Sequence, residues 1–313
     1  MKADHRSFEL SAAKQKVARL GDLFLEQGLL DAHQIEQIGQ TQRERKMRFG
    51  DAALHLGFLT QSQIEAALGE QFGHSSQLQY SGIAGEKLTF LRQPFSRESE
   101  EIRRLRSELL LKFANQDQIR IAVVSAGTAD GKSYMAASLA VALAQAGRRT
   151  LLIDTDLRNG DLHQLFGIEN PDGLSSVLAQ RRTLDEVALP LMPNLHFLPA
   201  GPLPPNPLEL IRLPEIRRLL DQHAERFDAF ILDTFPASLA SDAQMIAHQT
   251  GHALLIARKD QTEIDDLRVL KESMQIAGVE VLGTVFNHAP CTQMKSSMIS
   301  RFKAWFRPGR RKG

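Results

Sequence analysis

The sequence has few of the residues that build disulfide-rich, metal-clustered or membrane-spanning proteins. One cysteine, Cys291, stands among 313 residues, which excludes a disulfide framework and any metal site made of several cysteines. The ten histidines show no H-E-x-x-H or similar ligand spacing. No run reaches the ~18 apolar residues of a membrane-spanning helix, and no apolar segment follows the charged residues 1–6. We therefore expect a cytoplasmic protein.

Net charge is also small, but it is unevenly distributed. The chain carries +1 overall, while residues 291–313 hold seven Lys and Arg and no acid, so the rest carries −6 (+1 minus +7). On a helical projection of this basic tail the large apolar residues gather within about 140°; they are Met294, Met298, Ile299, Phe302, Trp305 and Phe306. A basic amphipathic helix can lie on an anionic membrane surface, pack on its own domain or remain a solvated tail, and all three readings stay open.

Residues 119–133, I-R-I-A-V-V-S-A-G-T-A-D-G-K-S, are the most informative stretch. An apolar run predicts a buried strand, small residues 126–131 predict a loop, and residues 134–146 predict a helix. The stretch matches the G-x-x-x-x-G-K-[ST] pattern, with Ala126 in place of its first glycine. This arrangement predicts a phosphate-binding loop (P-loop).

The chemistry of phosphate binding explains these residue types. Converging backbone N–H groups and a helix N-terminus favour an anion, and Gly127 and Gly131 let the backbone wrap around it. We expect Lys132 to contact the β- and γ-phosphates and the Ser133 hydroxyl to bind Mg²⁺. ATP and Mg²⁺ are therefore the expected cofactors.

Two further predicted strands end in aspartates. The apolar run within residues 150–156 (T-L-L-I-D-T-D) is followed by two aspartates, and the run within 228–233 (D-A-F-I-L-D) by one. Ligands bind where parallel strands end in open α/β sheets, so we expect these carboxylates near the P-loop. More strands are predicted at 195–198, 252–257 and 281–286, with helices between them. The fold class is therefore α/β, with a mostly parallel sheet covered by helices on both faces.

The first part of the chain contains an internal repeat. Arg19-Leu20-Gly21-Asp22 recurs 29 positions later as Arg48-Phe49-Gly50-Asp51. Each unit predicts a short helix, a glycine C-cap at Gly28 or Gly57, and a second helix from Asp31 or Thr60. We expect two helical hairpins packed face to face.

Four regions follow from these patterns. We expect an all-helical repeat domain at 1–74, a linker at 75–97, the P-loop domain at 98–290 and the basic tail at 291–313. The P-loop domain begins with an amphipathic helix at 99–113, whose apolar residues recur every three or four positions.

The repeat resembles the N-terminal domain of type II secretion and type IV pilus assembly ATPases through its R-L-G and G-x-[LI]-[ST] patterns. Some members of that family bind cyclic di-GMP, and they have a long spacer between the two units. Here five residues, 43–47, separate them. The short spacer favours a docking module over a cyclic di-GMP site.

Three blocks together resemble the bacterial tyrosine kinases (BY-kinases) that regulate exopolysaccharide chain length and export. They are Asp130-Gly131-Lys132-Ser133, L-L-I-D-T-D-L-R at 151–158 and I-L-D-T at 231–234. The spacing Glu100-x-x-Arg103-x-x-Arg106 is similar to the family's oligomerisation helix, and L-P-A-G-P-L-P-P-N-P at 198–207 adds to the likeness. With the N-terminal module, the chain resembles the chain length determinant protein tyrosine kinases.

The resemblance implies a role for each matching residue. Asp154 would accept the proton of the tyrosine hydroxyl, and the implied catalytic set is Lys132, Asp154, Asp156 and Arg158. Mg²⁺ would be held by Ser133, Asp156 and Asp233. The implied nucleotide-binding residues are Gly127, Asp130, Gly131, Lys132, Ser133, Tyr134 and Asn287.

The resemblance also implies partners. They are a membrane polysaccharide co-polymerase (chain length determinant protein) and further copies of this chain, contacted through Glu100, Arg103 and Arg106. An anionic membrane surface is a third candidate, and we expect no nucleic-acid partner. The protein would then work at the inner face of the cell membrane.

Two departures from the family pattern leave two functions open. Asp233-Thr234-Phe235-Pro236 replaces the usual D-T-P-P, and the tail lacks the family's tyrosine cluster, since Tyr80 and Tyr134 are the only tyrosines. One interpretation is a kinase whose acceptor lies on another protein. The other is a regulatory ATPase or scaffold of the polysaccharide assembly complex. A partitioning ATPase of the MinD/ParA type is disfavoured, because Gly127 stands where those proteins carry a signature lysine.

Overall fold

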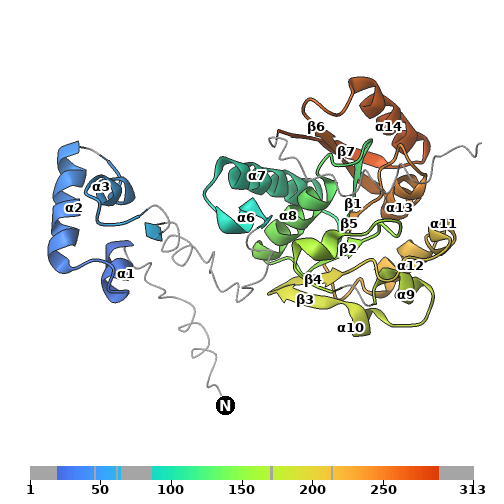
Figure 1. Ribbon diagram of the computed structural model, residues 1–313, viewed down its shortest axis with the longest axis horizontal. Helices are drawn as coiled ribbons and strands as arrows, with labels where there is room; N and C mark the ends of the chain where they lie inside the picture. Colours follow the sequence, from blue (N-terminus) through green and yellow to red (C-terminus); the bar gives the residue numbers. More distant parts are fainter. Residues whose placement is uncertain are drawn as a thin grey trace, which may run out of the picture.

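The computed structural model describes residues 20–45, 47–60, 63–64, 87–169, 172–212 and 214–288 (Figure 1). Its larger part is an α/β unit, and its smaller part is the helical repeat. Tyr80 and the predicted basic tail, residues 291–313, lie outside the described residues.

One seven-stranded sheet forms the centre of the α/β unit, in the order β3-β4-β2-β5-β1-β6-β7. Every neighbouring pair is parallel except β3 with β4. The strands are β1 (Ile119–Ser125), β2 (Thr150–Asp154), β3 (Leu189–Met192), β4 (Leu195–Leu198), β5 (Ala229–Asp233), β6 (His252–Arg258) and β7 (Glu280–Asn287). The predicted fold class is confirmed.

The sequence did not indicate β3, which is short and antiparallel at the edge of the sheet. It contains Pro190, and its register with β4 shifts between Pro190 and Met192. Proline cannot donate a ladder hydrogen bond and is tolerated in edge strands, so Pro190 is compatible with this position.

Helices cover both faces of the sheet. In β1, Ile121 and Val123 belong to one buried apolar cluster, while Ala122 and Val124 belong to the other. This explains the continuous apolar run, because a parallel strand between two helical layers is buried on both sides. The helices are α6 (Thr89–Arg92), α7 (Arg97–Lys112), α8 (Lys132–Gln145), α9 (Leu174–Leu178), α10 (Leu184–Val187), α11 (Pro207–Leu210), α12 (Glu215–Gln222), α13 (Asp242–Thr250) and α14 (Ile264–Ile276), with a 3₁₀ turn at Leu162–Leu165.

Helix α8 follows the P-loop directly and is buried along nearly its whole length, from Ala136 to Ala144. Its residues are mostly alanine, leucine and valine, and a helix that is apolar all round is one that is buried. Small side chains let α8 lie close to β1, β2 and β5. The first turn of α8 is thereby fixed relative to the ends of these three strands.

The predicted linker, 75–97, extends too far toward the α/β unit. Leu88 and Phe90 are buried in the same cluster as Ile102 of α7, and Ser96 caps α7 by accepting a hydrogen bond from the Ser99 N–H at 3.2 Å. The α/β unit therefore includes residue 88. Leu88 and Phe90 belong to a short apolar stretch, L-T-F-L at 88–91, which is too brief to show a period and so did not indicate their burial.

The repeat appears in the structure as two units with the same caps. Helices α1 (Leu20–Glu26) and α3 (Phe49–His55) are each followed by a glycine with positive φ, +67° at Gly28 and +70° at Gly57. The side chain of Gln34 accepts from the Asp31 N–H at 2.9 Å, ahead of α2 (Ala32–Arg45). Gln63 accepts likewise from the Thr60 N–H at 2.8 Å. The predicted second helix of the second unit lies mostly outside the described residues.

The described repeat has its own small core, centred on Phe24, Ile38 and Ala52. Across the described parts of the chain, no helix combines the length and the apolar character needed to cross a bilayer.

Candidate nucleotide and catalytic site

The P-loop lies between the end of β1 at Ser125 and the start of α8 at Lys132. Ala129 and Gly131 have left-handed backbone angles, with φ of +60° and +97°. A side chain at Gly131 would also place its Cβ 2.3 Å from the Asn287 Nδ2. Both the backbone angle and the space around it therefore require glycine at position 131.

Asp130 is buried beneath the loop, with its side chain occupied by hydrogen bonds. Its carboxylate accepts from the Gly127 N–H at 2.9 Å and from the Thr262 hydroxyl at 3.0 Å. The predicted contact of Asp130 with nucleotide would therefore be made by its main chain.

Lys132 and Ser133 meet the predicted metal-binding carboxylates. Ser133 donates a hydrogen bond to Asp233, and the Lys132 ammonium lies near Asp233 and Asp156. Burial raises the pKa of Asp233 to about 7, against the opposing influence of Lys132 and Ser133. The structure thus brings residues from the P-loop, β2 and β5 into one cluster.

Asp154 is the most enclosed carboxyl of the cluster, with 1% of its surface exposed. One oxygen accepts from the Asp156 N–H at 3.1 Å and the other from the Leu162 N–H at 3.2 Å. Burial raises the pKa of Asp154 well above its ordinary range, and the charges of Asp233 and Asp156 add to this shift. A raised pKa makes an ionised carboxylate a stronger proton acceptor than an ordinary aspartate.

Asp156 is less enclosed. One of its oxygens accepts from the Arg158 N–H at 3.0 Å and from the Asn159 N–H at 2.8 Å. Burial raises the pKa of Asp156, while these two N–H groups and Lys132 act in the opposite direction. Its carboxylate is thus oriented by the turn that follows β2.

The side-chain hydrogen bonds of Arg158 go to a carboxylate outside the predicted catalytic set. Its guanidinium makes a two-pronged contact with Asp242, at 2.9 and 3.1 Å, and it lies 5.4 Å from the centre of the Phe235 ring. Asp242 is buried at the start of α13. Phe235, which departs from the family's D-T-P-P, therefore provides a face for the cation. In this structure Arg158 connects the turn after β2 to α13.

Tyr134 and Asn287 also contact protein groups. The Tyr134 hydroxyl donates to Glu98 and accepts from the Thr89 N–H at 3.0 Å, so this side chain faces α6 and α7. The Asn287 amide donates to the main-chain oxygen of Asp130 at 3.0 Å. Asn287 thus contacts the P-loop itself, and contact of either side chain with nucleotide stays a prediction.

The cluster fits Mg²⁺. No group of three or more His, Cys, Asp or Glu side chains able to hold a metal occurs among the described residues. One oxygen of Asp233, however, is buried without a hydrogen-bond partner. Mg²⁺ commonly takes one or two carboxylates and completes its shell with water and phosphate oxygens. Ser133, Asp156 and Asp233 would hold it here, where it would neutralise phosphate charge.

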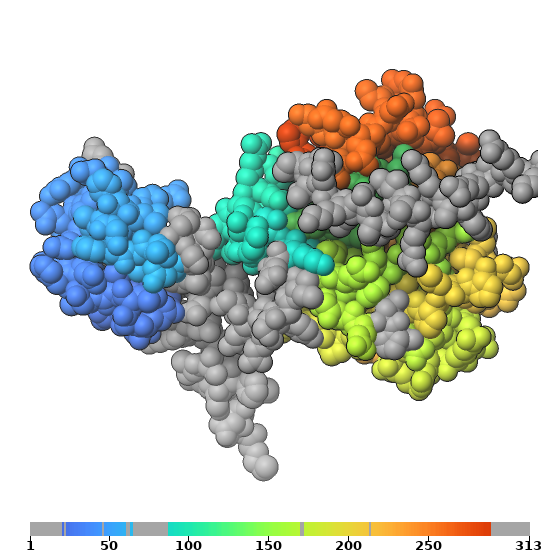
Figure 2. All heavy atoms as spheres, in the orientation of Figure 1, coloured from blue at the N-terminus to red at the C-terminus, as the bar shows by residue number. Residues whose placement is uncertain are grey.

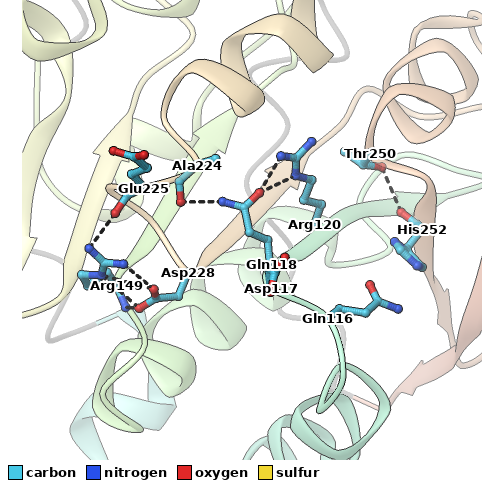
Figure 3. A pocket seen from close by; sticks show the side chains of 10 residues that line it. All are labelled: Gln116, Asp117, Gln118, Arg120, Arg149, Ala224, Glu225, Asp228, Thr250 and His252. Atoms are coloured by element: carbon cyan, nitrogen blue, oxygen red, sulfur yellow. Dashed lines mark hydrogen bonds and ion pairs between the residues drawn. The ribbon is translucent and has the colours of Figure 1, made fainter.

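A pocket of about 560 Å³ lies where β1, β2, β5 and β6 begin, at the ends of these strands far from the P-loop (Figure 3). Arg149 bonds Asp228 at 2.6 Å there, and Arg120 bonds the Gln118 side chain at 2.9 Å. The two arginines of this pocket are therefore paired with protein acceptors. It lies across the sheet from the P-loop and is separate from the carboxylate cluster.

Comparison with known proteins places this geometry in a family. Residues 121–301 match the CobQ/CobB/MinD/ParA nucleotide binding domain. The chain is 32% identical over 196 residues to the tyrosine-protein kinase YwqD of Bacillus subtilis, covering 62% of this chain and 83% of YwqD. It belongs to the bacterial tyrosine kinase family. The predicted family and the nucleotide-binding P-loop domain are confirmed.

Two further relatives show the extent of the match. EpsB of Ralstonia solanacearum is 36% identical over 206 residues, which cover 65% of this chain and 27% of EpsB. This chain thus spans only about a quarter of EpsB. The crystal structure of the chimerical protein CapA2B2 superposes with a TM-score of 0.62 at 34% identity, covering 66% of this chain and 91% of the chimera.

Several residues around the site were not predicted from the sequence. Asp242, the partner of Arg158, belongs to no motif recognised in the sequence, although it stands at the start of a helix. Arg258, Gln261 and Thr262 lie more than 120 residues after the P-loop that they contact. Only the proximity of β1 and β6 in the sheet brings them together, and that pairing is not visible in a linear motif.

Proposed function

We propose that this protein is an ATP-dependent protein-tyrosine kinase that regulates exopolysaccharide chain length, polymerisation or export. The observation that carries the proposal is the position of Asp154, a buried carboxyl with a raised pKa that stands opposite Asp233, the carboxyl on which Lys132 acts. Membership of the bacterial tyrosine kinase family supports the same reaction.

Each residue of the cluster then has a task in phosphoryl transfer. The loop N–H groups and Lys132 bind the phosphates of ATP, and Ser133, Asp156 and Asp233 hold Mg²⁺. Asp154 accepts the proton of the tyrosine hydroxyl as that oxygen attacks the γ-phosphorus, and the bond from the γ-phosphorus to the β–γ bridging oxygen breaks, so that ADP leaves. A free tyrosine hydroxyl has a pKa of about 10, so a carboxyl with a raised pKa is better matched to this proton than an ordinary one.

The acceptor tyrosine lies on another protein in this proposal. Tyr134 is a poor acceptor, because its hydroxyl is bonded to Glu98 and Thr89, and burial followed by the Glu98 hydrogen bond raises the pKa of Tyr134. Tyr80 lies outside the described residues. The partner proposed here is a membrane polysaccharide co-polymerase, and the similarity to the CapA2B2 chimera, whose name joins two components, supports such a pairing.

The contact proposed for further copies of the chain uses α7. Glu100 is largely exposed there and is available to a neighbour. Arg103 instead bonds Glu100 at 2.5 Å and the Pro94 carbonyl, with its side chain only 13% exposed. Arg106 donates to the Ala142 carbonyl at 3.3 Å. Both arginines therefore have contacts within their own subunit, and Nε of each is buried without a partner.

A regulatory ATPase or scaffold that binds ATP without transferring phosphate is the alternative, favoured by the absence of a tyrosine cluster in the tail. The two functions are separated by incubating the purified chain with Mg²⁺, ATP and the cytoplasmic segment of its co-polymerase, followed by mass spectrometry for phosphotyrosine. The kinase proposal expects phosphotyrosine on the partner, and none with the Lys132→Met variant. ATP binding by the wild type without phosphotyrosine would support the scaffold.

A further inference from the structure

Four consecutive main-chain carbonyls of the P-loop each accept a hydrogen bond from a different side chain. The donors come from the end of β1, the end of β6, the β6–α14 loop and the end of β7. The pairs are Ser125 Oγ to Gly127 O at 2.7 Å, Gln261 Nε2 to Thr128 O at 2.6 Å, Arg258 Nη1 to Ala129 O at 2.7 Å and Asn287 Nδ2 to Asp130 O at 3.0 Å.

These bonds restrict the direction of the neighbouring N–H groups. In a trans peptide unit the C=O of one residue and the N–H of the next point in opposite directions. Carbonyls of residues 127–130 that are held by outer side chains therefore leave the N–H groups of residues 128–131 directed to the other side. Alternating left-handed residues, Ala129 and Gly131, are typical of backbone that forms an anion-binding concavity.

The Asp130 carboxylate adds hydrogen bonds between the P-loop and the β6–α14 loop. It accepts from the Thr262 hydroxyl at 3.0 Å and from Gln261 Nε2 at 3.2 Å, as well as from the Gly127 N–H. Gln261 therefore reaches the loop at two points, Thr128 and Asp130. Both contacts come from the β6–α14 loop, which belongs to the segment that forms one edge of the α/β part (orange in Figure 2).

We infer that Arg258, Gln261 and Asn287 are positioning residues. They hold the P-loop in the conformation that binds the nucleotide phosphates before the nucleotide arrives. This rests on the proposed function only in that phosphates bind at this loop. A loop that is already ordered loses less conformational freedom on binding, which increases affinity without any new contact to the ligand. The β6–α14 loop thereby influences nucleotide affinity from outside the phosphate site.

The test is a titration of Mg²⁺ and ATP against the full chain by calorimetry. Each side-chain hydrogen bond contributes modestly, so the Arg258→Ala/Gln261→Ala double variant is expected to raise the Kd for ATP about tenfold. Gln261→Ala alone is expected to raise it about threefold, and it keeps the test open if the double variant is unstable. Arg258→Lys restores a donor and should recover most of the affinity lost in Arg258→Ala.

A merely structural role predicts a lower Tm in the nucleotide-free protein, whereas positioning predicts a changed Kd at an unchanged Tm.

The matched control is Arg268→Ala/Gln275→Ala, which removes the same residue types from the exposed surface of α14; it should bind ATP like the wild type. Lys132→Met should lose binding. If Lys132→Met loses binding and the Arg258→Ala/Gln261→Ala variant keeps wild-type affinity, the positioning role is wrong while the phosphate site stands. If Lys132→Met also keeps wild-type affinity, the phosphate site itself is wrong.

Discussion

Asp154 and Asp233 stand directly opposite each other as the last residues of two adjacent parallel strands, β2 and β5. Both carboxyls are almost fully buried, at 1% and 2% exposure. Burial is the main cause that raises the pKa of each, and Asp233 lies nearer to the positive charge of Lys132. In the proposed mechanism this asymmetry favours Asp154 as the proton acceptor and Asp233 as a metal ligand.

The first prediction concerns the Asp154→Asn variant, which keeps the shape of the side chain and removes its ability to accept a proton. General base catalysis contributes about 10²- to 10⁴-fold, so phosphotyrosine formation should fall by at least about 100-fold. The Kd for ATP with Mg²⁺ should change little. Single-turnover transfer and calorimetric binding measure the two effects. An equal loss of transfer and of nucleotide binding would assign Asp154 to the metal instead.

The second prediction concerns Gly160, in the turn that closes behind Asp154. A Cβ there would lie 2.5 Å from the Ala200 Cβ, 2.6 Å from the main-chain oxygen of Asp156 and 3.0 Å from a carboxylate oxygen of Asp154. Gly160→Ala should therefore displace Asp154 and lower kcat by roughly tenfold or more, since small displacements of reacting groups are costly. The KM for ATP should change much less.

Gly283→Ala is the matched control for that variant, because a Cβ at Gly283 meets nothing within 4 Å. It should keep wild-type kcat and KM. If both glycine variants retained full turnover, the close approach of Gly160 to Asp154 would have no catalytic importance.

The described strands other than β3, the P-loop and the aspartates at strand ends could be predicted from the sequence because each depends on local patterns. An apolar run, a glycine loop and a carboxylate at a strand end are each recognised from about ten consecutive residues. The partners of those groups could not be predicted. Arg158 was assigned to catalysis from its place in a motif, yet its bond to Asp242 joins residues 84 positions apart. The burial of Leu88 and Phe90 likewise depends on α7 and α8, which no pattern near residue 90 reveals.

The third prediction concerns the pH dependence of stability. It rests on Arg149 and Asp228, which lie where β2 and β5 begin, at the ends of these strands far from the phosphate site. Hydrogen bonding to Arg149 lowers the pKa of Asp228. The folded state thus binds this proton less readily than the unfolded chain, where an aspartate titrates near 3.9. The stabilisation is present above that pH and is lost as pH falls through the lower pKa of the folded state.

The Arg149→Gln variant should therefore have a lower Tm than the wild type at pH 7, and the difference should shrink below about pH 4. Both side chains are partly exposed, so added salt should reduce the difference at pH 7. Arg268→Gln, which removes a more exposed ion pair on α14, is the control and should change Tm little. A difference that stayed constant from pH 7 to pH 3 would exclude this pair as its cause.

The fourth prediction separates folding from assembly on α7. Arg103→Ala removes contacts with Glu100, the Pro94 carbonyl and the Phe90 ring, so it should lower Tm by several degrees. Any loss of oligomer in that variant would therefore be ambiguous. Glu100→Gln changes an exposed charge and should leave Tm nearly unchanged. If α7 contacts a neighbouring copy, Glu100→Gln reduces the mass seen by light scattering with ATP present; an unchanged mass would argue against that contact.

The last prediction concerns the basic tail, residues 291–313, which lies outside the described residues. Its sequence alone predicts an amphipathic helix at 294–307 with an apolar face that includes Phe302, Trp305 and Phe306, and the whole tail carries seven basic residues. Basic residues near an anionic bilayer contribute roughly 1 kcal/mol each, and the apolar face adds insertion into the interface. We therefore expect the full chain to co-sediment with anionic vesicles, less so at high salt, and expect no binding to zwitterionic vesicles. A variant truncated after Pro290 should stay in the supernatant. The truncated chain must keep its Tm and its affinity for ATP for this comparison to hold, and equal recovery of both chains in the supernatant would exclude a membrane role for the tail.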